Sequence, residues 1–187
     1  MRKLIVFNHI SLDGYFVGEN GDSSWFHQGN DDEFNSFVAE NSKGESELLF
    51  GRVTYDMMVS YWPTPKAAKD NPVVAAQMNK LPKIVFSKKM QKATWENTTL
   101  IKGDLIAEVK KLKAAAGPMI VIFGSGQIIS QLSQARLVDG YQLIINPIAL
   151  GKGRTFFEGM SEILQLKLVN SRTFKNGKVF LDFAVGG

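Results

Sequence analysis

The chain contains no cysteine among its 187 residues. This absence excludes a disulfide-stapled scaffold, a thiolate zinc site and a cysteine-based redox centre. The sequence also lacks an apolar run near the roughly 18 residues that a membrane-spanning helix needs. Its apolar start is too short and too soon interrupted to predict a signal peptide. We therefore expect a soluble, cytoplasmic protein without a membrane partner.

Several catalytic and binding signatures are missing as well. The two histidines, His9 and His27, lie at no spacing typical of a hydrolase triad. No H-x-x-x-H pair or carboxylate cluster predicts a metal site. The net charge is +4, but the basic residues are scattered and lack the interleaved aromatics of a nucleic-acid-binding face. A mild positive charge of this kind equally suits a phosphorylated small molecule.

The length and composition fit one globular domain. With 44% hydrophobic and 21% charged residues, the chain lies close to the average of folded proteins. A chain of this size buries roughly 70% of the surface that it exposes when unfolded, so a substantial core can form. No internal repeat or low-complexity linker interrupts the sequence. We therefore expect residues 1–187 to form a single domain.

Strand patterns alternate with helix patterns along most of the chain. The first strand pattern is apolar on both faces, which predicts a central place in the sheet. Asn30 and Glu33 form a variant of the capping box that opens a helix, and Phe34, Phe37 and Val38 make its apolar stripe. Further helices are expected at residues 52–60, 72–80, 104–116 and 127–134. The expected strands are residues 2–10, 47–51, 82–87, 98–101, 119–123 and 141–147.

The C-terminal part of the chain changes character. Two further strand patterns, residues 164–174 and 178–185, flank the dipeptide Asn176-Gly177. This dipeptide is the strongest short-range signal for a hairpin turn, because both residues tolerate positive φ. The order of elements thus predicts an α/β protein, a three-layer αβα sandwich. Its mixed, mostly parallel sheet would end in an antiparallel C-terminal hairpin.

A glycine junction stands where an apolar strand turns into a helix. Residues 121–132 read VIFGSGQIISQL, with Gly124, Ser125 and Gly126 at the turn. The glycines can serve a tight turn, or they can let a phosphate approach the free N–H groups of the helix start. The segment lacks the third glycine of the Rossmann fingerprint and the Gly-Lys-Ser/Thr of a Walker A motif. A Rossmann fingerprint would also follow the first strand, so that fold is not indicated.

Two other strand ends carry chemistry suited to anions. Gly51, Arg52 and Thr54 follow the second strand, and Ser87 and Lys88 follow the third. Ligands of open α/β sheets bind across the carboxyl ends of the strands. One ligand with several phosphates could therefore contact all three strand ends.

Other residues leave two interpretations open. Asp13, in SLDGYF after the first strand, suits either an Asp-Gly turn or a carboxylate directed into a pocket. Trp25 lies in a glycine-rich loop, where it could stack on a planar heterocycle or cover the edge of the core. Lys152 and Arg154 lie in a late glycine-rich turn, which could be a surface turn or a lid over a substrate phosphate.

The motifs SLDGYF, LLFGRVTYD, KIVFSKK, VIFGSGQIISQL and LVDGYQLIINPIALGKGRTFF occur in this order before the terminal hairpin. Together they resemble the dihydrofolate-reductase-like superfamily. Within it, they are most similar to the reductase (C-terminal) domain of the bifunctional riboflavin-biosynthesis deaminase–reductase. The resemblance covers almost the whole chain. It implies a mixed sheet flanked by helices, NADPH as the hydride donor, and a homodimer.

The resemblance also implies how NADPH would be held. Gly51, Arg52 and Thr54 would bind its adenosine-phosphate half, and Ser87 and Lys88 would flank the 2′-phosphate or the adenine. The pyrophosphate would be wrapped by Gly124, Ser125, Gly126, Gln127 and Ile128.

The same resemblance implies residues for the reacting centre. Asp13, with Trp25 near it, would face the nicotinamide and the substrate and would orient the substrate or relay a proton. The first-helix carboxylate that serves folate reduction has two candidate counterparts, Glu33 and Asp31.

We therefore expect an NADPH-dependent reductase that transfers hydride to a small heterocyclic substrate. The nearest analogue is 5-amino-6-(5-phosphoribosylamino)uracil reductase. One alternative is a dihydrofolate reductase, which would oxidise NADPH with dihydrofolate. Another is an NADPH-binding module without catalysis. A basic RNA-binding domain would instead show a salt-sensitive affinity for oligonucleotides.

Overall fold

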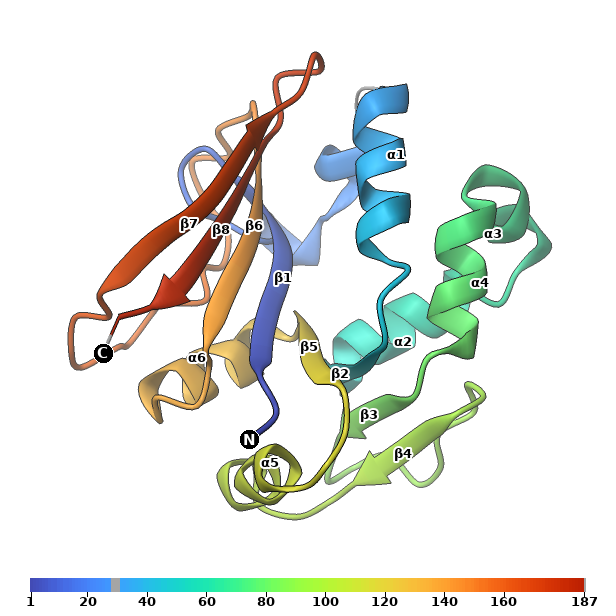
Figure 1. The fold of residues 1–187 in the computed structure, drawn as a ribbon, viewed down its shortest axis with the longest axis vertical. Coiled ribbons are helices and arrows are strands. Elements are labelled where there is room, and N and C mark those ends of the chain that lie inside the picture. Colours follow the sequence, from blue (N-terminus) through green and yellow to red (C-terminus); the bar gives the residue numbers. More distant parts are fainter. Residues whose placement is uncertain (28–30, 187) are drawn as a thin grey trace.

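The computed structural model describes residues 1–27 and 31–186 (Figure 1). The strands are β1 (Leu4–Ser11), β2 (Ser46–Gly51), β3 (Lys83–Phe86), β4 (Thr98–Ile101), β5 (Met119–Gly124), β6 (Gly140–Asn146), β7 (Leu166–Thr173) and β8 (Val179–Val185). The α-helices are α1 (Asp32–Asn41), α2 (Arg52–Tyr61), α3 (Pro65–Asp70), α4 (Pro72–Lys80), α5 (Leu105–Ala114) and α6 (Gly126–Gln134). Two short 3-10 helices, η1 (Glu19–Gly21) and η2 (Ser24–His27), follow β1.

The strands form one sheet in the order β4-β3-β2-β5-β1-β6-β8-β7. The pairs from β4 to β6 are parallel, whereas β8 runs antiparallel to both β6 and β7. The predicted mixed sheet with an antiparallel C-terminal hairpin is confirmed. Because β1, β2, β3, β5 and β6 are parallel, their carboxyl ends all lie at one edge of the sheet. We call this edge the carboxyl rim.

Helices cover both faces of the sheet, as Figure 1 shows. On one face α5 and α6 pack against the sheet, and their residues Val109, Ile129 and Leu132 join Val6 and Ile122 in a single buried cluster. On the other face, side chains of α1, α2 and α4 form two clusters with the sheet. The predicted three-layer sandwich is therefore confirmed.

The central place of β1 follows from its sequence. Leu4 and Val6 are fully buried on the α5–α6 face. Phe7 points the other way and packs in the cluster beneath α1. A strand that is apolar on both faces avoids water only where helices cover both faces of the sheet. β1 lies in such a place, between β5 and β6.

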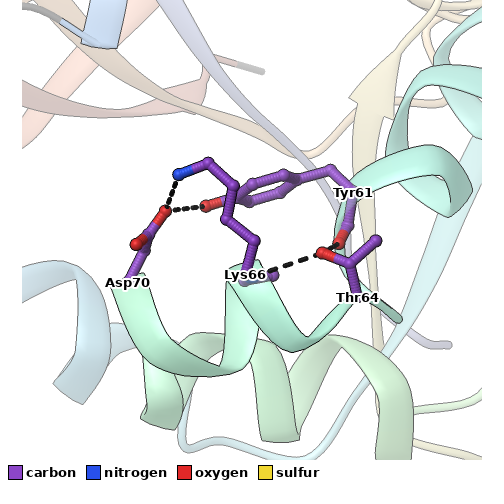
Figure 2. Close-up of polar contacts among 5 residues, drawn as sticks. Tyr61, Thr64, Lys66 and Asp70 are labelled. Atoms are coloured by element: carbon purple, nitrogen blue, oxygen red, sulfur yellow. Dashed lines mark hydrogen bonds and ion pairs between the residues drawn. The ribbon is translucent and has the colours of Figure 1, made fainter.

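The helix α3 is absent from the sequence-based expectation. Thr64 caps it, since its hydroxyl oxygen accepts a hydrogen bond from the Ala67 N–H at 3.2 Å, and Pro65 takes the first position. This Thr-Pro pair is a recognised start signal that could have revealed the helix. Figure 2 shows the corner between α2 and α3, where Asp70 pairs with Lys66 and accepts a 3.4 Å bond from the Tyr61 hydroxyl.

The start of α1 also differs from the expectation. The N-cap is Asp31, whose side chain accepts hydrogen bonds from the N–H groups of Glu33 and Phe34. Asn30, the expected cap, lies outside the described residues. Phe34 and Phe37 do form the apolar stripe of this helix, packing against Phe174.

One buried hydroxyl fixes α2 against the segment that follows β3. The Tyr55 oxygen accepts hydrogen bonds from the N–H groups of Thr94 and Trp95, at 3.0 and 2.7 Å. Tyr55 is only 2% exposed, so water cannot replace these bonds. The N-terminal end of α2 at the carboxyl rim is thereby held in position.

Tyr55→Phe should destabilise the fold by about 1–3 kcal/mol, because it leaves a buried N–H group without an acceptor. Urea unfolding followed by circular dichroism measures this difference. Tyr61→Phe, which removes a long and exposed hydrogen bond, should change stability by less than about 0.5 kcal/mol. Equal effects of the two substitutions would contradict the anchoring role of Tyr55.

Candidate active site

The three strand ends expected to bind an anion are neighbours at the carboxyl rim. In the sheet, Gly51 pairs with Phe86 of β3, and Phe50 pairs with Gly124 of β5. The turns that follow β2, β3 and β5 therefore lie side by side. The β2–α2 and β5–α6 turns are moreover in direct contact.

This contact leaves no room for side chains at two glycines. A Cβ on Gly51 would lie 2.7 Å from the Ser125 hydroxyl and 3.1 Å from the Ile128 Cδ1. Gly124 has φ +127°, and a Cβ there would lie 2.9 Å from the Thr54 hydroxyl. The Gly124–Ser125 peptide bond is cis. Close packing of the two turns thus accounts for the glycines at Gly51 and Gly124.

Gly126 has a different neighbour. A Cβ at this position would lie 2.4 Å from the ring of Phe16, which follows β1. Phe16 stacks on Phe156 with ring centroids 5.0 Å apart, and the Arg154 guanidinium lies 6.0 Å from its ring centroid. The missing side chain at Gly126 therefore makes room for Phe16. Phosphate binding alone would not have predicted this contact.

The starts of α2 and α6 offer hydrogen-bond donors at this junction. The N-cap residues Gly51 and Ser125 make no side-chain capping bond. N–H groups in the first turn of a helix have no partner within the helix, and together with the helix dipole they favour anions. Gln127 occupies that first turn of α6.

Two cationic segments flank the junction. Arg52, the first residue of α2, is half exposed and forms a 2.8 Å ion pair with Asp56 one turn later. Lys88 is exposed beside Ser87, whose oxygen accepts a hydrogen bond from the Met90 N–H at 3.0 Å. The accepting role of Ser87 is therefore used by its own turn, while its hydroxyl hydrogen can still be donated.

Asp13 ties two loops together. Its carboxylate accepts hydrogen bonds from the Ser11 hydroxyl at 2.6 Å, from the Gly151 N–H at 2.7 Å and from the Leu150 N–H at 3.1 Å. These bonds, that of Ser11 first, lower the pKa of Asp13 to about 2. A carboxyl group with this pKa is ionised at neutral pH and is poorly suited to donate a proton. The geometry therefore favours a positioning role for Asp13.

Backbone bonds continue the connection between these loops. The Leu12 N–H donates to the Ile148 carbonyl. The Phe16 N–H donates to the Arg154 carbonyl, and the Arg154 N–H donates to the Val17 carbonyl. A Cβ on Gly153 would lie 2.2 Å from the Val17 oxygen, so only glycine permits this approach. We refer to residues 12–17 and 148–154 as the paired loops. The paired loops place Phe16 beside the start of α6.

Trp25 is buried in η2. Its side chain is 5% exposed, and its indole N–H donates to the Asp22 carbonyl at 3.1 Å. The ring meets Phe26 edge-on, and Phe26 in turn stacks on His9 with centroids 4.8 Å apart. Of the two roles open for Trp25, this arrangement fits coverage of the core edge. Contact with a substrate stays a prediction.

The two carboxylates near the start of α1 are both engaged. Glu33 is partly exposed and forms a 2.8 Å ion pair with Arg172 of β7. Asp31 caps α1 and accepts a hydrogen bond from the Asn176 N–H at 3.1 Å. Burial opposes ionisation of Asp31, but the N–H donors of Asn176, Glu33 and Phe34 outweigh it, so its pKa is lowered.

Three polar residues at the rim were not predicted as functional. His9, Asn146 and Lys178 lie on the α1 face, where β1 and β6 end and β8 begins. The Asn146 Nδ2 lies 3.4 Å from the His9 Nδ1. The strand alternation of Lys178 with Phe180 could have placed this lysine on an inner face. Its proximity to Asn146 depends on strand register, which the sequence does not give.

Residues 1–27 and 31–186 carry neither a metal-ligand cluster nor a membrane-spanning helix. No group of three or more His, Cys, Asp or Glu side chains in this part of the chain could hold a metal ion. None of its helices combines the length and apolarity needed to span a bilayer.

The model of the "RibD C-terminal domain" family matches residues 2–180. The uncharacterized protein YyaP of Bacillus subtilis (strain 168) is 29% identical over 178 residues, covering 95% of this chain and 92% of YyaP.

Solved structures share the fold along nearly the whole chain. A "Putative riboflavin biosynthesis protein" from Shewanella sp. PV-4 has a TM-score of 0.79 at 23% identity, and each chain covers 99% of the other. The Thermotoga maritima deaminase/5-amino-6-(5-phosphoribosylamino)uracil reductase has a TM-score of 0.66 at 15% identity, with 99% of this chain matching 57% of that one. Enterococcus faecalis dihydrofolate reductase, complexed with NADP(H), has a TM-score of 0.66 at 16% identity, with 99% and 97% covered. These likenesses show a dihydrofolate-reductase-like fold.

The Asp13 contacts predict a titration at low pH. The folded pKa of about 2 lies below the ordinary value of 3.8. The carboxylate bonds thus stabilise the paired loops above pH 3.8, and this contribution is lost as the pH falls through about 2. The amide NMR resonances of Leu150 and Gly151 should shift with a midpoint near pH 2 and should lose this step in Asp13→Asn. A midpoint near 3.8 would show that the bonds do not form in solution.

The contact of Phe16 with Gly126 predicts a coupling between the two positions. Gly126→Ala should cost about 1–3 kcal/mol of stability, because its methyl group displaces the Phe16 ring. In a Phe16→Ala background, the same substitution should cost less than about 1 kcal/mol. Urea unfolding of the four proteins in this cycle measures the coupling. Identical costs in both backgrounds would show that Phe16 is not the residue that requires glycine.

Proposed function

The chain belongs to the RibD C-terminal domain family, whose model spans residues 2–180, and from this premise we propose that it is an NADPH-dependent reductase of a small polar heterocycle. Family membership supports an oxidoreductase of the riboflavin-biosynthesis type. That NADPH is the cofactor, and that it transfers hydride to the substrate, are parts of our proposal.

The observation that carries the proposal is the junction of the β2–α2 and β5–α6 turns. Two helix starts without side-chain caps lie together there, and glycines at Gly51 and Gly124 let the backbones approach. A dinucleotide presents a pyrophosphate and further phosphate charge along one extended molecule. The adjacent donors and the cations Arg52 and Lys88 match that distribution of charge.

Each expected cofactor residue has a defined task in this proposal. The first-turn N–H groups of α6 at Gly126 and Gln127 would hold the pyrophosphate together with Ser125. Ile128, whose own N–H donates to the Ser125 carbonyl at 3.0 Å, would line the same turn. The start of α2, with Arg52 and Thr54, would bind the adenosine-phosphate half, and Ser87 and Lys88 would flank the 2′-phosphate. When bound, NADPH supplies the hydride, and the protein orients it and excludes water.

The reaction that we propose reduces a C=N bond of the substrate. Hydride goes to the carbon and a proton goes to the nitrogen, so the cofactor leaves oxidised. Asp13, in this proposal, orients the substrate by fixing the paired loops, with Phe16 covering the start of α6. Trp25 would close one wall through its contact with Phe26.

By analogy, the substrate is a phosphoribosylamino-pyrimidine. A hollow of about 520 Å³ lies between the η1 segment and the turn that holds Lys152 and Arg154. Lys152 pairs with Glu19 across it at 2.7 Å, and both side chains are well exposed. These cations would attract a substrate phosphate to the paired loops. Folate reduction is less well supported, since Glu33 is held by Arg172 at the surface.

The decisive test combines binding and turnover. Tryptophan fluorescence titrations should give a tighter complex with NADPH than with NADH. NADPH oxidation should then follow addition of 5-amino-6-(5-phosphoribosylamino)uracil, with dihydrofolate as the comparison. Binding without oxidation of NADPH would favour the non-catalytic module, and no binding of either cofactor would refute the proposal.

Arg52→Ala should narrow the preference for NADPH over NADH by about tenfold. A charge-assisted hydrogen bond to the extra phosphate contributes about 1.5–3 kcal/mol, and the half-exposed Arg52 falls at the lower end of this range. The dissociation constants of both cofactors measure the effect.

Lys66→Ala provides the matched control. Lys66 is also an exposed cation paired with an aspartate four residues later, but it lies on α3. Its substitution should leave both cofactor affinities unchanged. Equal losses of NADPH and NADH affinity in Arg52→Ala would show that Arg52 does not bind the 2′-phosphate.

A further inference from the structure

A polar corner lies at the carboxyl rim next to the proposed cofactor junction. The last β6–β8 pair joins Ile145 to Val179, so Asn146 and Lys178 stand opposite each other one position further on. Residues opposite in an antiparallel pair share a face of the sheet. This face also carries Ile144 and Phe180 and is covered by α1. Because β1 separates β5 from β6, the corner is one strand away from the β5–α6 turn.

Lys178 is a cation buried in this corner. The residue is only 4% exposed, and within the described part of the chain its ammonium donates one hydrogen bond, to the Phe26 carbonyl at 2.7 Å. The ammonium also lies 4.6 Å from the centre of the Phe34 ring. Among residues 1–27 and 31–186, no carboxylate lies within the 4 Å of an ion pair with it. An ammonium has three N–H donors, so Lys178 retains capacity for a further acceptor.

Asn146 supplies the complementary group. Its Nδ2 donates to the carbonyls of Ile10 and Ile144, at 3.1 and 3.0 Å, which fixes the orientation of the amide. The Oδ1 is buried and accepts no hydrogen bond in the described part of the chain. The Asn176 Nδ2, on the adjoining hairpin, is likewise buried without a partner. Since a buried polar atom without a partner lowers the stability of the folded state, such atoms indicate a place where a ligand can complete the bonding.

Aromatic rings surround these polar groups. His9 stacks on Phe26 at 4.8 Å and meets Phe34 edge-on at 6.2 Å. Flat aromatic surfaces next to fixed donors and acceptors are typical of sites that recognise planar heterocycles.

Resting on the proposed function, we infer that this corner recognises the substrate ring through a lactam edge, a carbonyl oxygen next to a ring N–H. The carbonyl oxygen accepts from the Lys178 ammonium, and the ring N–H donates to the Asn146 Oδ1. Burial lowers the pKa of Lys178, with Asp31 offsetting part of this effect. A ring edge that presents one acceptor beside one donor matches the spare Lys178 N–H groups and the unpaired Asn146 Oδ1, so the inferred ligand class is a pyrimidinedione or a related oxo-heterocycle.

Two probes that differ at this edge test the inference. 5,6-Diaminouracil carries the lactam edge, whereas 2,4,5,6-tetraaminopyrimidine has amino groups in place of the carbonyls. Calorimetric titration of the full chain, with and without NADPH, should show binding of the first probe at least tenfold tighter than binding of the second. Lys178→Met should weaken binding of 5,6-diaminouracil about tenfold or more, because it removes a charge-assisted hydrogen bond. Lys175→Met, an exposed lysine in the same hairpin, should leave it unchanged.

A measurement on the wild-type protein makes the test independent of mutant folding. The Lys178 side-chain 13Cε resonance should shift when 5,6-diaminouracil is added, and the Lys175 resonance should stay in place. Equal affinity for the two probes, unchanged affinity in Lys178→Met, or an unmoved Lys178 resonance would each overturn the inference. Loss of NADPH binding alone would refute the proposed function, since 5,6-diaminouracil binding is read separately.

Discussion

The rim architecture depends on how closely the β2–α2 and β5–α6 turns approach each other. Gly51 faces Ser125 and Gly124 faces Thr54 at distances that no Cβ would permit. This contact places two helix starts together, each without a side-chain cap. The packing of β2 between β3 and β5 then adds the Ser87 turn to the same group. Close backbone packing, more than any single charged residue, thus creates a surface on which an extended anion can lie.

The paired loops add a second layer of organisation to this rim. Asp13 accepts N–H donors from residues that are 137 and 138 positions away, and Gly153 lets the two backbones meet. The paired loops thereby position Phe16 against Gly126. A carboxylate that binds three donors is restrained in position, which makes it effective as a tie between loops. The placement of Asp13 after β1 therefore serves the architecture of the site in addition to its chemistry.

More of the fold than of the candidate site could be predicted from the sequence. Strand and helix periods, the hairpin at Asn176-Gly177 and the doubly apolar first strand reflect local physics, and each appears in the structure. Only Gly177 of that dipeptide takes a positive φ, however, at +80°. The overlooked helix α3 had a local signal in Thr64-Pro65. The contacts of Gly126 with Phe16 and of Asn146 with Lys178 join distant segments, however. Strand register and loop packing determine such contacts, and neither can be derived from the spacing of residues in the sequence.

The polar groups at the rim differ in how completely the protein satisfies them. Asp13, Asp31 and Glu33 are bonded to backbone donors or to Arg172, so they stabilise loops and helix ends. Lys178 and the Asn146 Oδ1 are buried with unused hydrogen-bonding capacity, which lowers the stability of the free protein. A ligand that completes those bonds recovers this free energy on binding. The division between satisfied and unsatisfied groups therefore separates the residues that build the rim from those suited to recognise a substrate.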